Sequence, residues 1–595
     1  MLIAPGYHGP VIPPRLEWLL PEPRFDPPPF AGFGIPVATL LARRGFSGDV
    51  DLQRFLQAGE ESLHDTSLMA DADAALDRVE LAIARGQRIA IWGDYDADGM
   101  TAVAIWVIAL RSLGIEPLRH VPSRLEEGYG LAIGGLQALR AAGAELVITC
   151  DCGVTNVDEV EEAGRIGLEV IVTDHHLPPA MLPRAVAVVD PHRADCGYPD
   201  PDLTGAGVAF KLASALLARQ GRSAADLAAL AAIGTVADMA PMTGESRAIV
   251  RLGLDELAGT SRSGLRALLA RAAEDPAAPT ARDLAFGVAP RINAAGRIAA
   301  AELAISLLLE EDPAAAERIA DELEAVHIER RALTASAVDE ARVAAGRLPG
   351  DGPLALRNDG WAPGVLGLVA QRLVDLLTRP VAVAARIGDE VRGSVRAPSD
   401  FHVGKALDAC AALLSKRGGH PAAGGFSLDA EEWPAFVAAF GALPRPFPDD
   451  PTGTPQRPGR VTIDLVLPAL HLGWPLADEL QRLSPFGPGH VEPILAVTGL
   501  RVAEARRVGS SADHLSLRLR RGAQVFDAIG FGTPADRPLP EVGAAIDLVA
   551  TLERDFFQGM PRLRLRLVDY ADAAASPLAE RRNVAIALSR QSVVA

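Results

Sequence analysis

Lysine is almost absent from this chain of 595 residues. Only Lys211, Lys405 and Lys416 occur, so nearly all of the 58 basic side chains are arginines. Acidic side chains number 76, and the resulting formal charge of −18 argues against a protein that coats polyanions over its whole surface. Any contact with nucleic acid must therefore be local, and arginine is the side chain suited to bidentate phosphate binding. A compositional bias of the genome would produce the same excess of arginine.

Cysteine and long apolar runs are also scarce. The four cysteines have the spacing of neither a zinc site nor a disulfide framework, so we expect reduced thiols in a cytoplasmic protein. Residues 1–30 lack a basic segment followed by an apolar core, and no uninterrupted apolar stretch reaches about 18 residues. These absences predict a soluble chain without a targeting signal or a membrane contact.

The length of the chain predicts about three to five domains. Hydrophobic residues make up 49% of it, which is enough for sizeable cores. Proline-rich stretches near the start and near residue 450 mark boundaries. We predict an irregular N-terminal arm at 1–70, an α/β domain at 71–310, a connecting helix at 311–346, a second α/β domain at 347–443, a linker at 444–459, a small barrel at 460–570 and a tail at 571–595.

In the first α/β domain, apolar strands and helices alternate from residue 88 onward. This alternation is typical of a doubly wound, mainly parallel sheet. Ligands in such sheets bind beyond the carboxyl ends of the strands, and polar residues of this region fall at those ends. The expected strands are 88–93, 117–121, 145–150, 168–173 and 185–189, and the expected helices are 100–113, 131–142 and 155–166.

The first of these strands leads into the sequence GDYDADG at residues 93–99. It places Asp94, Asp96 and Asp98 at every second position. Carboxylates at this spacing repel one another unless a cation lies among them, so a hard divalent cation is the simplest explanation. A solvated acidic turn is the alternative. A calcium-binding loop is excluded, because its twelfth position, counted from Asp94, holds Ile105 rather than glutamate.

Further acids and imidazoles follow two other strands and one alanine-rich helix. They are Asp151, Asp174, His175, His176 and Asp238. Taken alone, Asp238 would be a simple turn residue. Oxygen ligands supplemented by imidazole favour manganese, or magnesium as a compromise, over structural zinc. Two such ions bridged by a carboxylate suit in-line attack on phosphorus, so we predict hydrolysis of a phosphate ester or anhydride.

Three later segments have the composition of phosphate-binding sites. Arg291 and Arg297 enclose small residues, and Ser394 and Arg396 lie on one face of a predicted strand. His420 is the largest side chain in a glycine-rich segment, where the backbone can approach a ligand closely. A surface turn is the alternative for the first segment, and a flexible loop is the alternative for the last.

Short alternating strands between residues 461 and 568 suggest a small barrel. Between residues 501 and 521, six arginines stand against two acids, which reverses the sign of the whole chain. Arg518 and Arg520 alternate with leucines and should share one face of the barrel. A positive face suits the backbone of a single-stranded nucleic acid, and an ordinary solvated sheet face is the alternative.

These motifs together resemble those of the DHH phosphoesterase superfamily and, within it, the RecJ single-strand-specific exonucleases. The resemblance covers most of residues 70–570. It rests on motifs in a fixed order, namely GDYDADG at 93–99, Asp151 with Gly153, DHH at 174–176, TVADMAP at 235–241, RINAAGR at 291–297, GGH at 418–420 and LSPFGPG at 483–489.

The resemblance implies a fold and an activity. The fold would be a DHH domain, a DHHA1 domain joined to it by a long helix, and an OB-fold in the barrel. The activity would be degradation of single-stranded DNA from its 5′ end to mononucleotides, in DNA repair and recombination. The expected assembly is a monomer, with a single-strand-binding protein and a helicase as partners.

The resemblance also implies two manganese ions, with magnesium as a substitute. Asp96 and Asp151 would hold one ion, with Asp94 nearby. His176 would face the scissile phosphate as a polarising or acid group. The second ion would share the bridging carboxylate of Asp151, and its ligands would be Asp98, Asp151, His175 and Asp238.

For the DNA, the resemblance implies that Arg297, Ser394 and Arg396 grip the terminal 5′ phosphate. Asn293 and His420 would help to bind phosphate. One position departs from the superfamily, because Trp92 stands where many members carry a histidine. The first ion would then depend on Asp94 or water.

Two other functions remain open at this stage. Related DHH proteins hydrolyse pyrophosphate, oligoribonucleotides or cyclic dinucleotides, but they lack a barrel with a positive face. A non-catalytic replication scaffold on the same fold should have lost metal ligands, whereas all the acidic ones are present here.

Overall fold

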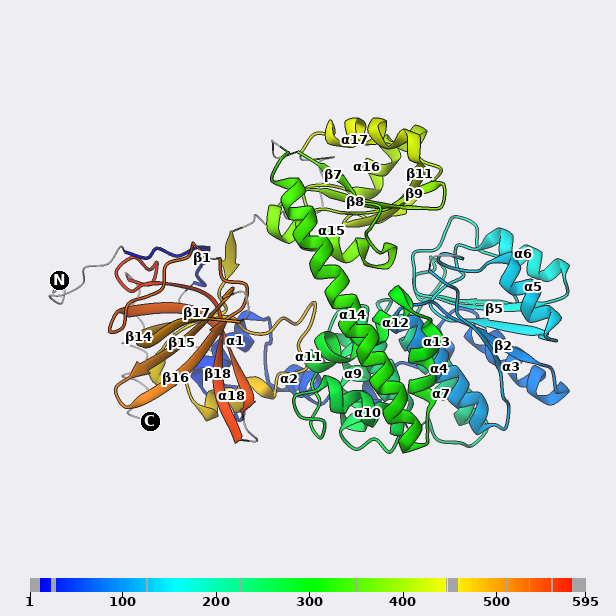
Figure 1. Cartoon of the computed structure of the whole chain (residues 1–595). Coiled ribbons are helices and arrows are strands. Elements are labelled where there is room, and N and C mark those ends of the chain that lie inside the picture. The colour runs from blue at the N-terminus through cyan, green and yellow to red at the C-terminus, as the bar shows by residue number, and fades with distance from the viewer. Residues whose placement is uncertain are drawn as a thin grey trace. The chain divides into compact units, whose positions relative to one another are not determined.

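The computed structural model divides into two compact units (Figure 1). One comprises Met1–Ala58, Arg457–Phe486 and His490–Ala595, and the other comprises Gly59–Gln456 with Gly487–Gly489. The first ten residues, much of the predicted linker and most of the predicted tail lie outside the described residues. The structure describes residues 11–22, 28–124, 127–224, 226–348, 350, 352–445, 447, 459–509, 512–534, 536–557 and 560–579.

A five-stranded parallel sheet organises the first α/β domain. Its strands are β2 (Ile89–Trp92), β3 (Leu118–His120), β4 (Leu146–Thr149), β5 (Glu169–Thr173) and β6 (Ala187–Val189). Their order is β3-β2-β4-β5-β6, and every neighbouring pair is parallel, which confirms the predicted doubly wound sheet. The strand order changes direction between β2 and β4, and ligands of such sheets bind at this point.

Two hydrophobic clusters hold this sheet, one on each face. Ile89 and Ile91 join the cluster formed with α4 and α7, whereas Ala90 and Trp92 join the cluster formed with α5 and α6. The helices around the sheet are α3 (Ala72–Arg85), α4 (Ala97–Ser112), α5 (Ile133–Ala141), α6 (Val157–Arg165) and α7 (Gly205–Arg219). Alternating residues of one short strand therefore fix helices on both faces.

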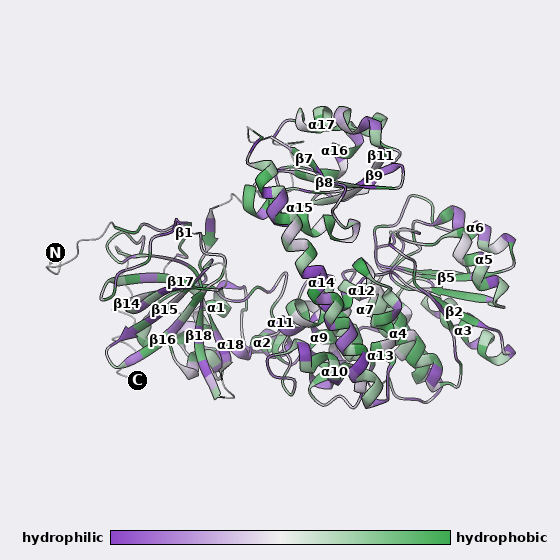
Figure 2. Cartoon of the chain, viewed as in Figure 1, coloured by the Kyte–Doolittle hydropathy of each residue, from purple (hydrophilic) through white to green (hydrophobic). Residues whose placement is uncertain are grey.

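Apolar helices complete the domain behind the sheet. In Figure 2, α4 is coloured mainly as hydrophobic, and α7 and α8 (Leu227–Ala237) pack against it. Gly234 allows this packing, because a Cβ there would lie 2.4 Å from Ala206 Cβ and from Asp98 Oδ1. Within the described ranges, no helix combines the length and the hydropathy needed to cross a membrane. The other helices are α9 (Gly244–Ala258), α10 (Ser263–Ala272), α11 (Ala281–Asp283), α12 (Ala289–Ile298) and α13 (Ala301–Leu309).

The predicted connecting helix is α14 (Pro313–Ala345). The second α/β domain follows it, with a sheet of order β10-β11-β9-β8-β7. Its elements are β7 (Leu354–Arg357), α15 (Leu366–Leu377), β8 (Val381–Ile387), β9 (Glu390–Arg396), α16 (Val403–Ala409), β10 (Lys416–Gly419), β11 (Ala423–Asp429) and α17 (Trp433–Gly441). The glycine-rich segment around His420 is not a flexible loop, because it forms the antiparallel hairpin of β10 and β11.

A closed barrel forms the core of the other unit. Its five strands are β14 (Leu495–Val508), β15 (His514–Arg521), β16 (Gln524–Gly530), β17 (Ala545–Phe557) and β18 (Met560–Asp572). They pair in the order β14-β15-β16-β18-β17, and β14 closes the barrel by pairing with β17. Along β16 and β18, hydrophilic and hydrophobic bands alternate (Figure 2), as expected when one face of each strand fills the interior. The predicted barrel is confirmed.

Two short strands precede the five strands of the barrel. β13 (Leu465–Pro468) pairs in parallel with β14, and β12 (Arg460–Thr462) pairs with β1 (Glu17–Leu19). The helix α18 (Trp474–Gln481) follows β13. The segment that begins the predicted barrel at residue 461 therefore forms two strands, of which β13 joins the barrel sheet.

The prediction of an irregular N-terminal arm is wrong for its middle part. Residues there form α1 (Ile35–Arg43) and α2 (Asp49–Leu56), which bury Leu40, Leu41 and Leu52 among the barrel leucines. The proline content concealed these helices, although Pro36 stands in the first turn of α1, where proline suits a helix.

Candidate metal centre and phosphate pocket

The acidic stretch after β2 is folded by its own hydrogen bonds. Asp96 is the N-cap of α4, and its Oδ1 accepts from the backbone N–H of Asp98 at 3.0 Å and of Gly99 at 3.1 Å. Glycine is required at position 99, because a Cβ would lie 2.7 Å from the backbone nitrogen of Asp94. The three carboxylates are thereby gathered at the end of one strand.

Asp98 lies against the N-terminus of a second helix. Its side chain is 2% exposed, and its oxygens accept from the backbone N–H of Gly205 at 2.7 Å and of Ala206 at 3.0 Å. The dipole of α7 stabilises negative charge at this end. Gly205 also leaves room for a neighbour, since a Cβ on it would lie 2.5 Å from the Cβ of Asp151.

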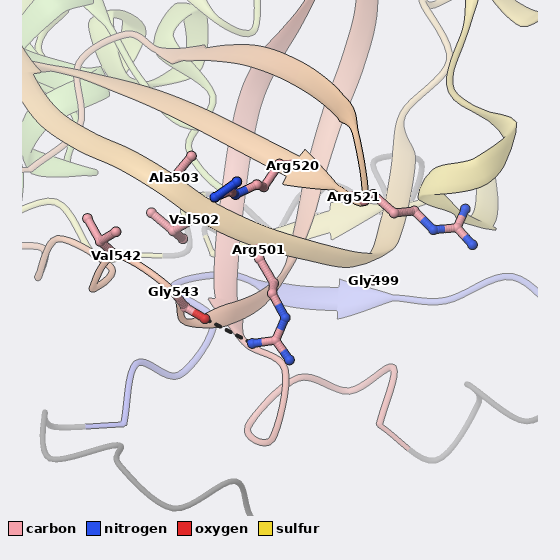
Figure 3. A pocket seen from close by; sticks show the side chains of 9 residues that line it. Gly499, Arg501, Val502, Ala503, Arg520, Arg521, Val542 and Gly543 are labelled. Carbon is pink, nitrogen blue, oxygen red and sulfur yellow. Dashed lines mark hydrogen bonds between the residues drawn. The ribbon is translucent and has the colours of Figure 1, made fainter.

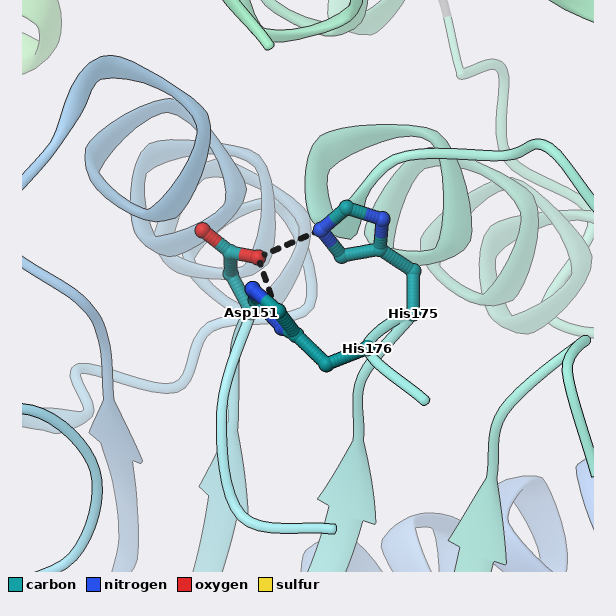
Figure 4. Close-up of side chains that lie close together, drawn as sticks. All are labelled: Asp151, His175 and His176. Carbon is teal, nitrogen blue, oxygen red and sulfur yellow. Dashed lines mark ion pairs between the residues drawn. The ribbon is translucent and has the colours of Figure 1, made fainter. Parts of the chain in front are cut away.

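Asp151 sits in a left-handed turn after β4. Its φ of 64° costs a residue other than glycine about 1–3 kcal/mol. The backbone N–H of Asp151 is fixed by the carbonyl of Thr173 at 3.1 Å. The turn places the carboxylate beside two imidazoles (Figure 4), with Oδ1 3.0 Å from Nε2 of His175 and 3.9 Å from Nδ1 of His176. This strained backbone positions a functional side chain.

Three overlapping sets of these side chains could each surround a cation. Nε2 of His175 is 3.8 Å from a carboxylate oxygen of Asp98 and 3.8 Å from one of Asp238. Among the described residues, Oδ1 of Asp94 is buried without a hydrogen bond, and the 3.0 Å contact of Oδ1 of Asp151 with His175 lacks hydrogen-bond geometry, which fits a ligand role for both oxygens. The donor atoms suit manganese or magnesium. Each set lies within 4.8 Å, and the sets are Asp94, Asp96 and Asp151; Asp98, His175 and Asp238; and Asp151, His175 and His176.

The electrostatics of this centre also favour a cation. Burial raises the pKa of Asp94, Asp98 and Asp151 well above the usual aspartate range, and neighbouring aspartates raise it further. Burial and the charge of Asp96 bring the pKa of Asp238 to about 7. Burial, and then the charge of His176, lower the pKa of His175 to about 4, which leaves a neutral imidazole able to bind metal. A bound cation would supply the positive charge that keeps the acids ionised.

Asp174, the first residue of the DHH motif, orients the last. It is fully buried and is held by the backbone N–H groups of Val154 at 3.0 Å and His175 at 2.8 Å. Its Oδ1 lies 2.7 Å from Nδ1 of His176. Burial alone would lower the pKa of His176, but the hydrogen bond and charge of Asp174 raise it to about 9. With Nδ1 engaged in this way, Nε2 is the nitrogen of His176 left for a substrate.

Trp92, the departure from the superfamily pattern, is a packing residue. Its ring is fully buried against α5, lies 4.1 Å from the ring of His120, and donates from Nε1 to the carbonyl of Gly130 at 3.3 Å. The set that contains Asp94 and Asp96 therefore consists of carboxylates alone.

Beyond the acids, arginines gather where α12 meets the second α/β domain. Nη1 of Arg297 donates to the carbonyl of Gly364 at 3.3 Å, and Nη1 of Arg396 donates to Oγ of Ser394 at 2.9 Å. Burial, and then the charge of Arg124, lower the pKa of Arg297 to about 10 and lower that of Arg396 as well. Crowded, desolvated guanidinium groups of this kind suit a bound anion.

The RINAAGR motif holds Arg297 beside the acidic stretch. Oδ1 of Asn293 accepts from the backbone N–H of Ala97, at the start of α4, at 2.9 Å. Gly296 allows the close approach, because a Cβ there would lie 1.8 Å from the carbonyl oxygen of Tyr95. Asn293 thus ties the two motifs together through a backbone group, and its role in binding phosphate stays a prediction.

Sequence reasoning missed two arginines of this pocket. The guanidinium of Arg124 lies 3.9 Å from the ring centroid of Tyr95, and after burial the charges of Arg124 and Arg330 are the largest causes of the lowered pKa of Arg297. Among the described residues, Nε of Arg124 and Nε of Arg330 are buried without a hydrogen bond. Arg124 lies in a connection without a motif and Arg330 in a long charged helix, so no sequence signal separates them from solvated arginines.

Of two other residues predicted to bind phosphate, Arg291 has structural partners, and the ring of His420 has no partner among the described residues. Arg291 donates from Nε to Glu324 at 2.5 Å and from Nη1 to the carbonyl of Gly287 at 2.9 Å, so its guanidinium ties α12 to α14. His420 is exposed in the turn between β10 and β11, and its ring forms no hydrogen bond with the residues described. A phosphate contact by His420 stays a prediction, whereas the structure gives Arg291 a structural partner instead.

The barrel face is less positive than its sequence suggests. Arg518 is exposed, but its Nε lies 3.3 Å from Asp527. The arginines of β18 are paired in the same way, with Arg564 3.0 Å from Asp555 and Arg566 2.7 Å from Glu492. Acids on neighbouring strands, together with Glu492 before β14, thus neutralise most of the alternating arginines.

One pocket on the barrel keeps its positive charge. Arg501 of β14 lies directly opposite Arg520 of β15, and Arg521 follows on the same rim (Figure 3). Nη1 of Arg501 donates to the carbonyl of Gly543 at 3.0 Å. The residues that line this pocket include these three arginines and no acid. The predicted contact of Arg520 with an anion therefore has a plausible location, whereas Arg518 already has a partner.

Comparison with known proteins gives the same three domains in the same order. Residues 88–235 match the DHH family, N-terminal domain; residues 342–443 match the DHHA1 domain; and residues 463–569 match the RecJ OB domain. These matches correspond to the first α/β domain, the second α/β domain and the barrel.

The relatives are single-stranded-DNA-specific exonucleases named RecJ. The Bacillus subtilis protein is 33% identical over 539 residues, covering 90% of this chain and 68% of the relative. The Escherichia coli protein is 32% identical over 552 residues, covering 88% and 94%. The structure of RecJ in complex with Mn²⁺ from Thermus thermophilus superposes with a TM-score of 0.76 at 31% identity, covering 93% of this chain and 79% of that one. Given the ordered domains and this similarity over nearly the whole length, the chain belongs to the family of RecJ single-stranded-DNA-specific exonucleases.

Proposed function

We propose that this chain hydrolyses single-stranded DNA from its 5′ end to mononucleotides, with two divalent cations, manganese or magnesium. The observation that carries the proposal is the pair of donor sets around Asp151. Asp151 forms one set with Asp94 and Asp96 and another with His175 and His176, and His175 is grouped in turn with Asp98 and Asp238. Relatives named RecJ have been crystallised with Mn²⁺ and with Mg²⁺, which supports the choice of metal.

Each residue of the metal centre would have a separate role in the reaction. When bound, the two cations would supply Lewis acidity at the phosphodiester and an activated water for in-line attack. Asp151 would hold both cations at one spacing, because its strained turn fixes the carboxylate. His175, neutral at physiological pH, would serve as a ligand, and His176, positively charged, would donate from Nε2 to an oxygen of the scissile phosphate.

The arginine pocket would select the end of the strand. Arg297, Arg396 and Ser394 are predicted to grip the terminal 5′ phosphate, and Arg124 and Arg330 add charge at the same place. A terminal phosphate monoester carries more negative charge than an internal diester, so a desolvated cluster of arginines prefers it. The distance between this pocket and the cations would then fix the bond that is cut.

The proposal can be tested with strands of 30 nucleotides labelled at the 3′ end. Purified protein receives manganese and either single or double strands, each with a 5′ phosphate or a 5′ hydroxyl. We expect stepwise shortening of the single strand, fastest with the 5′ phosphate. The Asp151→Ala variant should bind DNA without cutting it, and Asp158→Ala, an exposed aspartate of α6, should behave as wild type. Normal cutting by Asp151→Ala would refute the bridging role.

A DHH phosphodiesterase or pyrophosphatase of small substrates is the other catalytic candidate. The observation in its favour is that the acidic centre alone does not specify a polymer. Faster turnover of pyrophosphate, a cyclic dinucleotide or a dinucleotide than of the 30-nucleotide strand would favour it. The RecJ OB domain match argues for the longer substrate.

The remaining proposals concern the partners, the oligomeric state and the location of the enzyme. A single-strand-binding protein and a helicase are proposed partners, and the proposed state is a monomer in the cytoplasm. Sedimentation of the purified chain, alone and with each partner, tests the assembly. Absence of hydrolysis of every strand, with manganese or with magnesium, would instead favour the non-catalytic scaffold.

A further inference from the structure

A tyrosine that no motif singled out contacts the catalytic histidine. Tyr129 lies between β3 and α5, and its hydroxyl oxygen is 3.0 Å from Nδ1 of His176 and 3.2 Å from the carbonyl oxygen of Asp151. The two rings meet edge to face, with centroids 5.4 Å apart and planes at 65°. The hydroxyl therefore bridges the turn after β4 and the turn after β5.

The direction of these hydrogen bonds follows from the groups involved. The carbonyl of Asp151 can only accept, so the single proton of the phenol points to it. The phenol oxygen then accepts from the N–H at Nδ1 of His176. Oδ1 of Asp174 accepts from the same N–H at 2.7 Å. Nδ1 carries the proton in this arrangement, and both of its acceptors hold it there.

One acceptor does not fix the orientation of an imidazole. A ring held only by Asp174 can still tilt about the line from Nδ1 to the carboxylate oxygen, which swings Nε2 sideways. The hydroxyl of Tyr129 supplies a second point of attachment, and its ring edge limits the tilt. Because Tyr129 is anchored to the backbone of Asp151, the position of Nε2 is tied to the residue proposed to hold both cations.

We propose that Tyr129 is a positioning residue that holds Nε2 of His176 at the scissile phosphate. This inference rests on the proposed function for the identity of the substrate. A misplacement of about 1 Å in a reacting group can cost about 100-fold in rate, so removal of the second attachment should be visible in kcat.

The test compares two variants that each lose one tyrosine hydroxyl. Tyr129→Phe removes the contact with His176 and keeps the ring. Tyr198→Phe removes a hydroxyl that donates to Oε2 of Glu245 at 2.6 Å in the buried interior of the same domain. We expect Tyr129→Phe to lower kcat about tenfold to 100-fold, with KM within about twofold. Tyr198→Phe should keep wild-type kcat and lower only the unfolding temperature.

A double variant shows whether Tyr129 acts through His176. In single-turnover assays, Tyr129→Phe added to His176→Ala should cause no further loss of rate, because there is no ring left to position. A further loss of about tenfold would mean that Tyr129 contacts the substrate or supports the fold, and would overturn the proposal. Wild-type kcat in Tyr129→Phe would overturn it as well.

The role of Tyr129 can still be tested if the proposed substrate is wrong. If the wild type cuts a small phosphodiester rather than single-stranded DNA, the same variants are compared on that substrate. The stabilisation of Tyr129→Phe by manganese should match wild type in every case, since no proposed ligand is altered. A reduced response to manganese would assign Tyr129 to the metal centre instead.

Discussion

The acidic edge of the parallel sheet and the basic face of the barrel are both clusters of like charge in the sequence, but they differ in burial and partners. At the sheet edge, Asp94, Asp98 and Asp151 are at most 4% exposed. Among the described residues, Asp98 and Asp151 have histidine as an ion-pair partner, and none of the three is paired with lysine or arginine. On the barrel, Arg518 is exposed and faces Asp527.

The contrast shows how to tell a ligand site from a solvated surface. An unpaired charge in the interior costs several kcal/mol, whereas an exposed ion pair contributes about 0–1 kcal/mol. A fold keeps the first arrangement only if a ligand compensates the cost. Alternating charges on an exposed strand need no ligand, because neighbouring strands supply the opposite sign.

The largest effect is expected from Asp94→Asn. The change removes one charge from the carboxylate set, so the manganese-dependent rate should fall by about 100-fold or more. Without metal, the unfolding temperature should stay the same or rise, because a buried repulsion is relieved. Release of labelled nucleotide and thermal unfolding measure the two quantities.

Asp527→Asn on the barrel is the matched control. It leaves Arg518 without its partner, so the unfolding free energy should fall by less than about 1 kcal/mol, with an unchanged rate. If Asp94→Asn were instead active and less stable than wild type, the sheet edge would be an ordinary structural cluster.

The second prediction concerns the metal itself. At a manganese concentration 100 times the dissociation constant, one site adds about 2.7 kcal/mol to the unfolding free energy. Burial raises the pKa of the acids, so they bind protons that a cation must displace. Because the pKa of Asp238 is about 7, binding should weaken as the pH falls from about 8 to about 6. Calorimetric titration at both pH values measures this, and an equal affinity at both would contradict it.

The parallel sheet and the acidic centre could be predicted because both depend on local patterns. Apolar runs ended by Asp94, Asp151 and His175 specify strands, and the carboxyl ends of parallel strands necessarily meet at one edge. The barrel followed in the same way from the alternation of leucine and arginine. The roles of individual ligands stay predictions that the geometry makes specific.

Other features depend on helix geometry or on tertiary approach. Arg291 and Arg297 are six residues apart, which places them about 120° apart around α12, so one faces α14 and the other faces the pocket. The sequence analysis assigned no helix to this segment, so it predicted the same phosphate-binding role for both arginines. Arg124 and Tyr129 come from a connection without periodicity, and only the folded chain brings them to Arg297 and His176.

The third prediction compares Arg396, which lies in the arginine pocket, with Arg291, which is paired with Glu324. Arg396→Gln should raise KM for a strand with a 5′ phosphate by about tenfold, because a charged hydrogen bond of about 1.5–3 kcal/mol is lost. KM for a 5′-hydroxyl strand should change little. Arg291→Gln should lower the unfolding temperature through the loss of Glu324 and keep the preference for the phosphate. Equal loss of preference in both variants would contradict the assignment.

The smallest effect is expected on the barrel. There, two variants compare Arg520, whose pocket is lined by no acid, with Arg518, which faces Asp527. Arg520 lines the pocket opposite Arg501, and like charges facing each other across two strands destabilise a sheet unless an anion lies between them. Arg520→Gln should therefore weaken binding of a long single strand and reduce the slope of log affinity against log salt by about 0.7. Arg518→Gln should leave the slope nearly unchanged, since its charge is already compensated by Asp527. Equal slopes for the two variants would mean that partners on neighbouring strands do not decide which surface arginines meet DNA, and the contrast with the sheet edge would then rest on burial alone.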